Sequence, residues 1–220
     1  MIRLNGVGKS YASGRIVALD DVGLQLGPGD FAVVTGPSGS GKTTLLNVIA
    51  GLTRPDRGAV EVMGHELWAL SDDERTDLRG REVGFIFQFP SLLPELSLLD
   101  NVRMQLRLSG RSDDPEAARA LLAAAGLSGR EDSRAHELSA GQQRRAAAAR
   151  ALVHRPRLIL ADEPTGDLDP DSAAAIVTLL QEANVNGATV VMTTHDLDLR
   201  RLGSRLFTIS HGRINPTEIR

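Results

Sequence analysis

The sequence predicts an α/β protein: a core with a parallel sheet, an antiparallel β subdomain at the N-terminus and an inserted α-helical subdomain. Apolar, β-branched runs recur along the chain and end in polar residues, a glycine-rich turn joins one of them to a helix, and residues 89–137 contain no strand-like run. Alternating strands and helices are typical of parallel sheets. We therefore expect one compound domain over residues 1–220, with its core in 1–88 and 138–220 and the helical subdomain in 89–137.

The N-terminal part of the chain predicts antiparallel strands. Residues 2–7 and 18–26 alternate apolar and polar side chains, and a turn rich in glycine and proline follows at 27–30. Residues 59–64 alternate in the same way after the turn at 54–58. These segments are the expected antiparallel subdomain.

A glycine-rich turn then joins a buried strand to a helix. Residues 31–35 are apolar and β-branched, and residues 44–50 have helical spacing. The residues at this junction are Gly36, Pro37, Ser38, Gly39, Ser40, Gly41, Lys42, Thr43 and Thr44. Their spacing fits a phosphate-binding loop, in which backbone N–H groups and the helix N-terminus surround a polyphosphate. In such a loop Lys42 reaches the β- and γ-phosphates and the Thr43 hydroxyl binds Mg²⁺.

The alternative is an ordinary glycine turn in which Ser40 caps the helix and Lys42 is merely solvated. The use of lysine argues against it, because Lys9 and Lys42 are the only lysines in a chain that otherwise uses arginine. A compact ammonium at this one position is consistent with a site that needs a point charge.

Polar residues follow three further predicted strands. The strands are expected over residues 83–88, 157–161 and 188–194. They end at Gln88, at Asp162 and Glu163, and at His195. Because ligands bind at the carboxyl ends of parallel strands, we expect these groups to converge on the phosphate-binding loop. There Asp162 suits Mg²⁺, Glu163 could accept a proton from an attacking water, and His195 could contact the γ-phosphate.

The helices are indicated by their capping residues. Ser71 and Glu74 are spaced as a capping box, and Asp114 precedes a proline at the start of a helix that glycine ends at residue 126. A further helix is expected over residues 144–153. The apolar segment 89–94 holds two prolines and is either an exposed contact surface or a buried linker.

Composition excludes several classes of protein. A net charge of −3 gives no support to sequence-independent nucleic-acid binding. The absence of cysteine excludes disulfides and thiolate metal sites. No leader-like start and no run near the roughly 20 apolar residues of a membrane span are present. We therefore expect a chain that does not insert into the membrane directly and reaches it only through a partner.

The remaining motifs resemble one family. Over its whole length the chain is similar to the nucleotide-binding subunit of ABC transporters, whose core is a phosphate-loop NTPase (RecA-like) fold. Residues 138–142, Leu-Ser-Ala-Gly-Gln, look like the signature sequence of that family, although glycine is usual where Ala140 stands. The other matching positions, in chain order, are Tyr11, the loop ending at Lys42 and Thr43, Gln88, Asp162 and Glu163, Gly166 to Asp169, and His195.

The resemblance implies how ATP is held. Tyr11 would stack on adenine, and Ser139 and Gly141, with Gln142 beside them, would contact the γ-phosphate bound by the opposite subunit. Two copies would close head to tail around two ATP molecules, with Asp169 in the loop that crosses between them. Asp169 also suits an ordinary role as the cap of the helix that begins at residue 170.

The resemblance also implies a catalytic set and a location. Gln88 would couple Mg²⁺ and the attacking water to the membrane partner, and would act with Glu163 and His195 in ATP hydrolysis. The partner is a separate transmembrane permease, which places the chain in the cytoplasm on the inner face of the cell membrane. Segments 79–88, 92–97 and 163–169 look most like the lipoprotein-release, macrolide-export and cell-division group.

Three alternatives are weighed against an ATPase that drives transport. A subunit that signals across the membrane without moving solute, as in cell division, has the same motifs. A DNA-repair ATPase is disfavoured, because the stretch between Gln88 and Ser139 is short and has neither a long heptad insertion nor a cysteine zinc module. A phosphate-loop kinase would not need residues 139–142.

Overall fold

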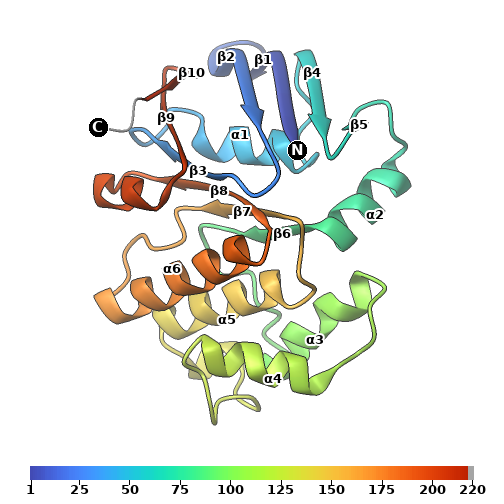
Figure 1. Cartoon of the computed structure of the whole chain (residues 1–220), viewed down its shortest axis with the longest axis vertical. Coiled ribbons are helices and arrows are strands. Elements are labelled where there is room, and N and C mark those ends of the chain that lie inside the picture. Colours follow the sequence, from blue (N-terminus) through green and yellow to red (C-terminus); the bar gives the residue numbers. More distant parts are fainter. Residues whose placement is uncertain (218–220) are drawn as a thin grey trace.

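The structure, a computed structural model, describes residues 1–217. They form a four-stranded sheet with the order β2-β1-β4-β5 and a six-stranded sheet with the order β10-β9-β3-β8-β7-β6. Figure 1 shows the small sheet and α1 on one side of the six-stranded sheet, and α3, α4, α5 and α6 on the other. The predicted α/β class is confirmed.

The four-stranded sheet is the N-terminal antiparallel unit that the sequence predicts. Its strands are β1 (Ile2–Tyr11), β2 (Ile16–Leu26), β4 (Arg57–Val62) and β5 (His65–Glu66). All of their pairings are antiparallel. The first hairpin is longer than predicted, because β1 continues to Tyr11 and pairs there with Ile16.

The six-stranded sheet carries the predicted buried strands. Its strands are β3 (Phe31–Thr35), β6 (Val83–Ile86), β7 (Leu158–Asp162), β8 (Thr189–Thr194), β9 (Arg205–Ser210) and β10 (Arg213–Pro216). Every pairing is parallel except that of β10 with β9. The sequence did not predict β9 and β10, and β6 ends two residues before Gln88.

The helices begin where their caps indicate. They are α1 (Lys42–Ile49), α2 (Asp72–Glu82), α3 (Leu98–Leu108), α4 (Pro115–Ala124), α5 (Ala140–Leu152) and α6 (Pro170–Val185), with 3₁₀ turns at Ala135–Glu137 and Leu197–Leu202. Ser71 forms the predicted capping box with Glu74, and Asp114 caps α4. The helix expected from residue 144 begins earlier, because Ser139 caps it.

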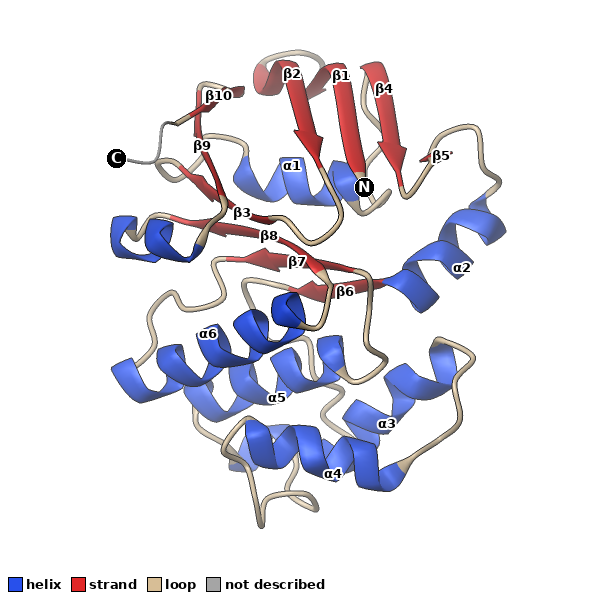
Figure 2. Cartoon of the chain, in the orientation of Figure 1, coloured by secondary structure: helices blue, strands red, loops and turns tan. Residues whose placement is uncertain are grey.

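Alternating side chains divide the core into two layers. On β3, Val34 packs with α1 and the small sheet, whereas Val33 packs with the helices on the opposite face. Figure 2 shows the same division, with α1 and the small sheet above the large sheet and α3, α4, α5 and α6 below it. The strand β6 lies so close to α5 that a Cβ on Gly84 would be 2.3 Å from the Ala151 carbonyl oxygen. The sheet therefore fixes α1 on one face and α5 on the other.

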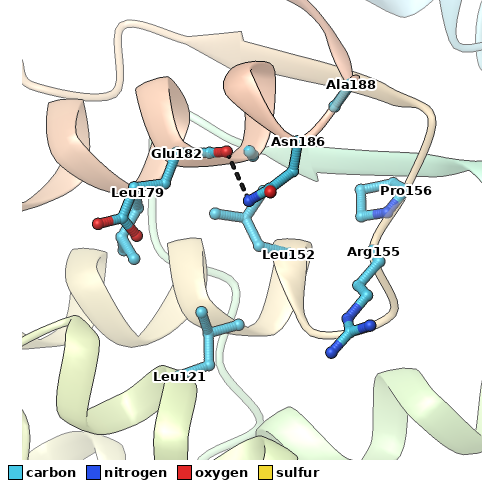
Figure 3. A pocket seen from close by; sticks show the side chains of 9 residues that line it. Leu121, Leu152, Arg155, Pro156, Leu179, Glu182, Asn186 and Ala188 are labelled. Carbon is cyan, nitrogen blue, oxygen red and sulfur yellow. Dashed lines mark hydrogen bonds between the residues drawn. The ribbon is translucent and has the colours of Figure 1, made fainter.

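A cavity of about 540 Å³ lies at the amino ends of β7 and β8, between α4, α5 and α6 (Figure 3). It is lined by Leu121, Leu152, Arg155, Pro156, Leu179, Glu182, Ala183, Asn186 and Ala188. Ligands of parallel sheets bind at the carboxyl ends of the strands, so this cavity lies at the edge opposite to the expected functional site.

Candidate nucleotide-binding site

The loop between β3 and α1 has a backbone that only glycine allows at two positions. Gly41 has φ of 108°, and a Cβ there would lie 2.2 Å from the Ala18 carbonyl oxygen. A Cβ on Gly36 would lie 2.2 Å from the carbonyl oxygen of Ile209. No side chain caps the N-terminus of α1. The backbone N–H groups of the first turn are therefore available to an anion, and the helix dipole favours one there.

Lys42 folds back over this loop. Its ammonium donates to the carbonyl oxygens of Gly36 at 2.7 Å and Pro37 at 3.1 Å, and lies 3.2 Å from Glu163 Oε1. The residue is only 7% exposed. A buried ammonium with carbonyl and carboxylate oxygens around it is a strong donor to phosphate oxygens that replace them.

Asp162 lies between two threonine hydroxyls. Thr43 Oγ1 donates to Asp162 Oδ2 at 2.7 Å, and Thr193 Oγ1 donates to Asp162 Oδ1 at 2.7 Å. Residues 1–217 contain no group of three or more histidine and acidic side chains arranged as a metal cage. This donor set fits Mg²⁺, which takes one or two protein oxygens and fills its remaining positions with phosphate and water.

Glu163 is held in an uncommon backbone conformation beside Asp162. Its φ is 46°, in the left-handed region, which costs about 1 kcal/mol outside glycine. The Glu163 N–H donates to Thr193 O at 3.1 Å and its carboxylate oxygen Oε2 lies 2.9 Å from His195 Nδ1. The backbone N–H of His195 also donates to this oxygen, at 3.2 Å. The carboxylate is thus fixed between Lys42 and His195.

The structure brings Lys42, Thr43, Asp162, Glu163 and His195 together, but it does not bring the Gln88 side chain to them. Gln88 follows β6 and is exposed, and its side chain has no hydrogen-bond partner among residues 1–217. Its backbone carbonyl is held instead, by Arg144 Nη2 at 2.9 Å.

Tyr11 lies at the end of the first hairpin as part of an exposed apolar platform. Lys9 Nζ is 5.5 Å from the centre of its ring, and the exposed Ile16 is its partner on the strand opposite. Val17 is also exposed, but it pairs with Ser10 and therefore faces the other side of the hairpin. The sequence did not lead us to predict Ile16 and Val17 as site residues. The signal was present as two adjacent β-branched residues directly after the turn that follows Tyr11.

The segment beginning at Ser139 lies at the N-terminus of α5. Ser139 Oγ accepts the Gln142 N–H at 3.2 Å and the Gln142 side chain accepts the Ser139 N–H, so both residues cap α5. A Cβ on Gly141 would lie 2.8 Å from Ser172 Oγ and 3.2 Å from Asp169 Oδ2. This segment therefore borders the start of α6, and α5 lies on the opposite face of the sheet from α1 (Figure 1).

Asp169 caps α6 as its sequence context predicts. Its carboxylate accepts the Ser172 N–H at 2.9 Å. The hydrogen bonds from Ser172 hold the pKa of Asp169 below its ordinary value. The carboxylate is therefore ionised at neutral pH, exposed, and next to Gly141.

Comparison with known proteins identifies the family. Residues 19–166 match the family described as ABC transporter. The lipoprotein-releasing system ATP-binding protein LolD of Pseudomonas fluorescens is 44% identical over 214 residues, which cover 94% of each chain. The macrolide export ATP-binding/permease protein MacB of Bordetella avium is 43% identical over 97% of this chain and 33% of its own length.

Solved structures of the ATP-binding cassette MJ0796 have the same fold. A dimeric post-hydrolysis state of that cassette, bound to ADP and Pi, is 37% identical, with a TM-score of 0.94 over 100% of this chain and 99% of the other. A second dimeric structure, described as a bacterial ABC transporter cassette, is 38% identical with the same TM-score. The phosphate-loop NTPase fold and the family resemblance are confirmed. The chain belongs to the ABC transporter family, as a subunit that binds and hydrolyses ATP.

Proposed function

We propose that two copies of this chain bind two ATP molecules head to tail, and that ATP hydrolysis drives a separate permease. The placement of Ser139 carries this proposal. The helix that Ser139 caps lies on the opposite face of the sheet from the phosphate-binding loop, so one chain does not present both surfaces to the same phosphates. The dimeric structures of the related cassette support a second copy as the source of the missing half.

Each copy would hold the nucleotide at two places. The adenine ring would stack on Tyr11, with Ile16, its partner on the neighbouring strand, extending the apolar platform. The phosphates would bind the N–H groups between Gly36 and Thr44, and Lys42 would exchange the Glu163 carboxylate for phosphate oxygens. The partner's copy of segment 139–142 would then complete the pocket around the γ-phosphate.

Mg²⁺ would be held by the Thr43 hydroxyl and by Asp162, directly or through water. When bound, the ion neutralises charge on the phosphate oxygens. Thr193 keeps the Asp162 carboxylate in position by donating to its other oxygen. The protein thus supplies few ligands, and Asp162 is held by a second hydrogen bond, from Thr193.

Glu163 would act as the general base. Its carboxylate would take a proton from the attacking water while the water oxygen bonds to the γ-phosphorus, and the bond to the β-phosphate oxygen breaks to release ADP. His195, which contacts Glu163 through both its backbone N–H and its ring, orients the carboxylate and would reach the γ-phosphate. Gln88 would join this set only after its exposed side chain turns inward.

The permease would dock beside Gln88. Phe89 is 74% exposed, and Phe87 and Leu93 are exposed on the same segment. The ring of Phe87 stacks on Phe85 with 4.1 Å between centroids, so this surface is anchored to β6. Exposed aromatic side chains are typical of interface centres. The sequence left open whether segment 89–94 is exposed. Its aromatic residue, Phe89, is exposed.

The output would be of the export or lipoprotein-release type, because relatives that cover nearly the whole chain are named for lipoprotein release and macrolide export. No helix within residues 1–217 has the length and apolar character of a membrane span. As the partner of a permease, the chain would work in the cytoplasm on the inner face of the membrane.

Size-exclusion chromatography with ATP and Mg²⁺ tests the dimer. Glu163→Gln should keep ATP bound and elute as a dimer, because the general base is removed and the nucleotide persists. In that background Ser139→Asp keeps the helix cap, since aspartate caps as well as serine, but places a negative charge against the partner's γ-phosphate. It should abolish the dimer and leave ATP binding by the monomer intact. A dimer that survives Ser139→Asp, or wild-type turnover by Glu163→Gln, would contradict the proposal.

A further inference from the structure

Arg144 is a buried arginine that contacts two loops of the site at once. It lies in α5, five residues after Ser139, and is only 8% exposed. Its Nη2 donates to the Gln88 carbonyl oxygen at 2.9 Å, and its Nη1 donates to the carbonyl oxygen of Gly166. One guanidinium therefore joins the segment after β6 and the segment after β7 to the same helix.

No carboxylate in the described part of the chain pairs with the charge of Arg144. Among residues 1–217, the ion pairs within 4.0 Å do not include it. A buried charge costs several kcal/mol of desolvation, and well-packed apolar side chains often stabilise a fold as well or better. Stability alone is therefore a weak reason for arginine here, whereas the planar fork is suited to holding two separate acceptors.

Its neighbour Arg145 makes hydrogen bonds of the same kind to a different part of the chain. Arg145 Nη1 donates to the carbonyl oxygens of Ala125 at 2.9 Å and Gly126 at 3.2 Å, at the end of α4. Both arginines thus bond two backbone carbonyls. Only the acceptors of Arg144 belong to loops that carry site residues, because Gln88 is itself one of them and Gly166 lies between Glu163 and Asp169.

We propose that Arg144 is a positioning residue of the ATPase reaction. Its guanidinium fixes the backbone of Gln88 and of the 163–169 loop relative to α5, whose N-terminus presents Ser139 to the partner copy. A displacement of the permease-docking segment then moves the base-bearing loop and the Ser139 segment together. This role rests on the ATPase function proposed above. It adds that Arg144 holds the segment after β6, the 163–169 loop and α5 in one arrangement.

Steady-state ATP hydrolysis by Arg144→Gln, with Arg145→Gln as the matched control, tests this role. Both variants lose two hydrogen bonds from the same helix to backbone carbonyls. Arg144→Gln should lower kcat by about tenfold to a hundredfold, the range expected for misplacement of about 1 Å. Its KM for ATP should stay within about threefold, because Arg144 touches neither the phosphate-binding loop nor Tyr11. Arg145→Gln should keep kcat within about twofold.

Amide hydrogen exchange provides a readout of the loops themselves. Peptides covering residues 87–94 and 164–169 should exchange faster in Arg144→Gln and at the wild-type rate in Arg145→Gln. Equal kcat in the two variants, or unchanged exchange in both loops of Arg144→Gln, would overturn the proposal. Wild-type protein that hydrolyses no ATP would instead refute the proposed function itself.

Arg144→Lys separates the fork from the charge and covers the case in which Arg144→Gln does not fold. Lysine keeps the positive charge and the apolar stem but presents one ammonium, which does not span both acceptors with the fork geometry. Its kcat should fall at least about fivefold, toward that of Arg144→Gln. Wild-type kcat in Arg144→Lys would show that charge alone suffices and would overturn the positioning role of the fork.

Discussion

The carboxylate of Glu163 lies 3.2 Å from the ammonium of Lys42, and both side chains are almost fully buried. The proposed general base and the proposed phosphate-binding lysine therefore neutralise each other. Phosphate oxygens that bind Lys42 must compete with this carboxylate, and the exchange leaves Glu163 with His195 as its remaining partner. Binding of ATP phosphates to Lys42 and release of the Glu163 carboxylate from Lys42 are therefore the same exchange of partners.

Lys42→Ala should weaken ATP binding at least about tenfold, because a hydrogen bond to a charged group contributes about 1.5–3 kcal/mol. It should also lower the melting temperature, since removing the ammonium leaves the buried Glu163 carboxylate without the cation that faces its Oε1 atom. The double variant with Glu163→Gln should recover the melting temperature but not the affinity. Calorimetric titration with ATP and thermal unfolding measure the two effects, and unchanged affinity in Lys42→Ala would contradict the role of the loop.

Thr43→Val should raise the Mg²⁺ concentration needed for half-maximal ATP hydrolysis. Valine has the shape of threonine but no hydroxyl to bind the ion or to donate to Asp162. We expect a shift of about tenfold or more, the effect that loss of even an outer-shell partner has on metal affinity. Thr43→Ser keeps the hydroxyl and serves as the control. Equal Mg²⁺ requirements in the two variants would remove Thr43 from the ion's ligands.

The convergence of the site was predictable because polar residues directly follow apolar strands. Asp162 ends β7 and His195 follows β8, and parallel pairing of the two strands brings these residues to one edge. The ion pair of Lys42 with Glu163 was not predictable, since it depends on side-chain conformations within that edge. The sequence placed both residues at the site but said nothing of their contact.

The contacts of Arg144 were not predictable from the sequence, for a different reason. Its acceptors are backbone carbonyls 56 and 22 residues away, and any residue type supplies a carbonyl. β10 was missed because it is short and carries few apolar residues. β9 was missed although it is as long as β8, and its pairing depends on β3 and on β10. The division into residues 1–88 with 138–220 and residues 89–137 stays a prediction, since α3 and α4 share one hydrophobic core with the large sheet.

Gly41→Ala should destabilise the protein and weaken nucleotide binding together. The new Cβ would meet the Ala18 carbonyl at 2.2 Å, and φ of 108° is unfavourable for alanine. Gly84→Ala makes a similar clash, at 2.3 Å from the Ala151 carbonyl, but lies in β6 outside the phosphate-binding loop. Both variants should lose roughly 1–3 kcal/mol of unfolding free energy, and only Gly41→Ala should lower ATP affinity in calorimetry below its unfolding temperature. Loss of affinity in both would show that general destabilisation is the cause.

His154 should make the stability of the fold depend on pH near pH 5. Its ring is fully buried, and within residues 1–217 neither ring nitrogen has a hydrogen-bond partner in good geometry. Burial lowers the pKa of His154 to about 4 from 6.5; the nearby backbone of Val83 opposes this shift and the charge of Arg111 adds to it.

Because the pKa is lower in the folded state, the stabilising contribution is complete above pH 6.5 and is lost as the pH falls toward 4. At pH 5 the loss amounts to about 2 kcal/mol of unfolding free energy. Asp113, whose pKa is lowered to about 2 by Arg103 and Arg107, acts only below about pH 3.8 and does not overlap this range. Urea unfolding at pH 7.5 and pH 5 should show the loss in wild type and its absence in His154→Met. His136→Met, which replaces an exposed histidine, should retain it. An equal loss of unfolding free energy in His154→Met and wild type would show that another group is responsible.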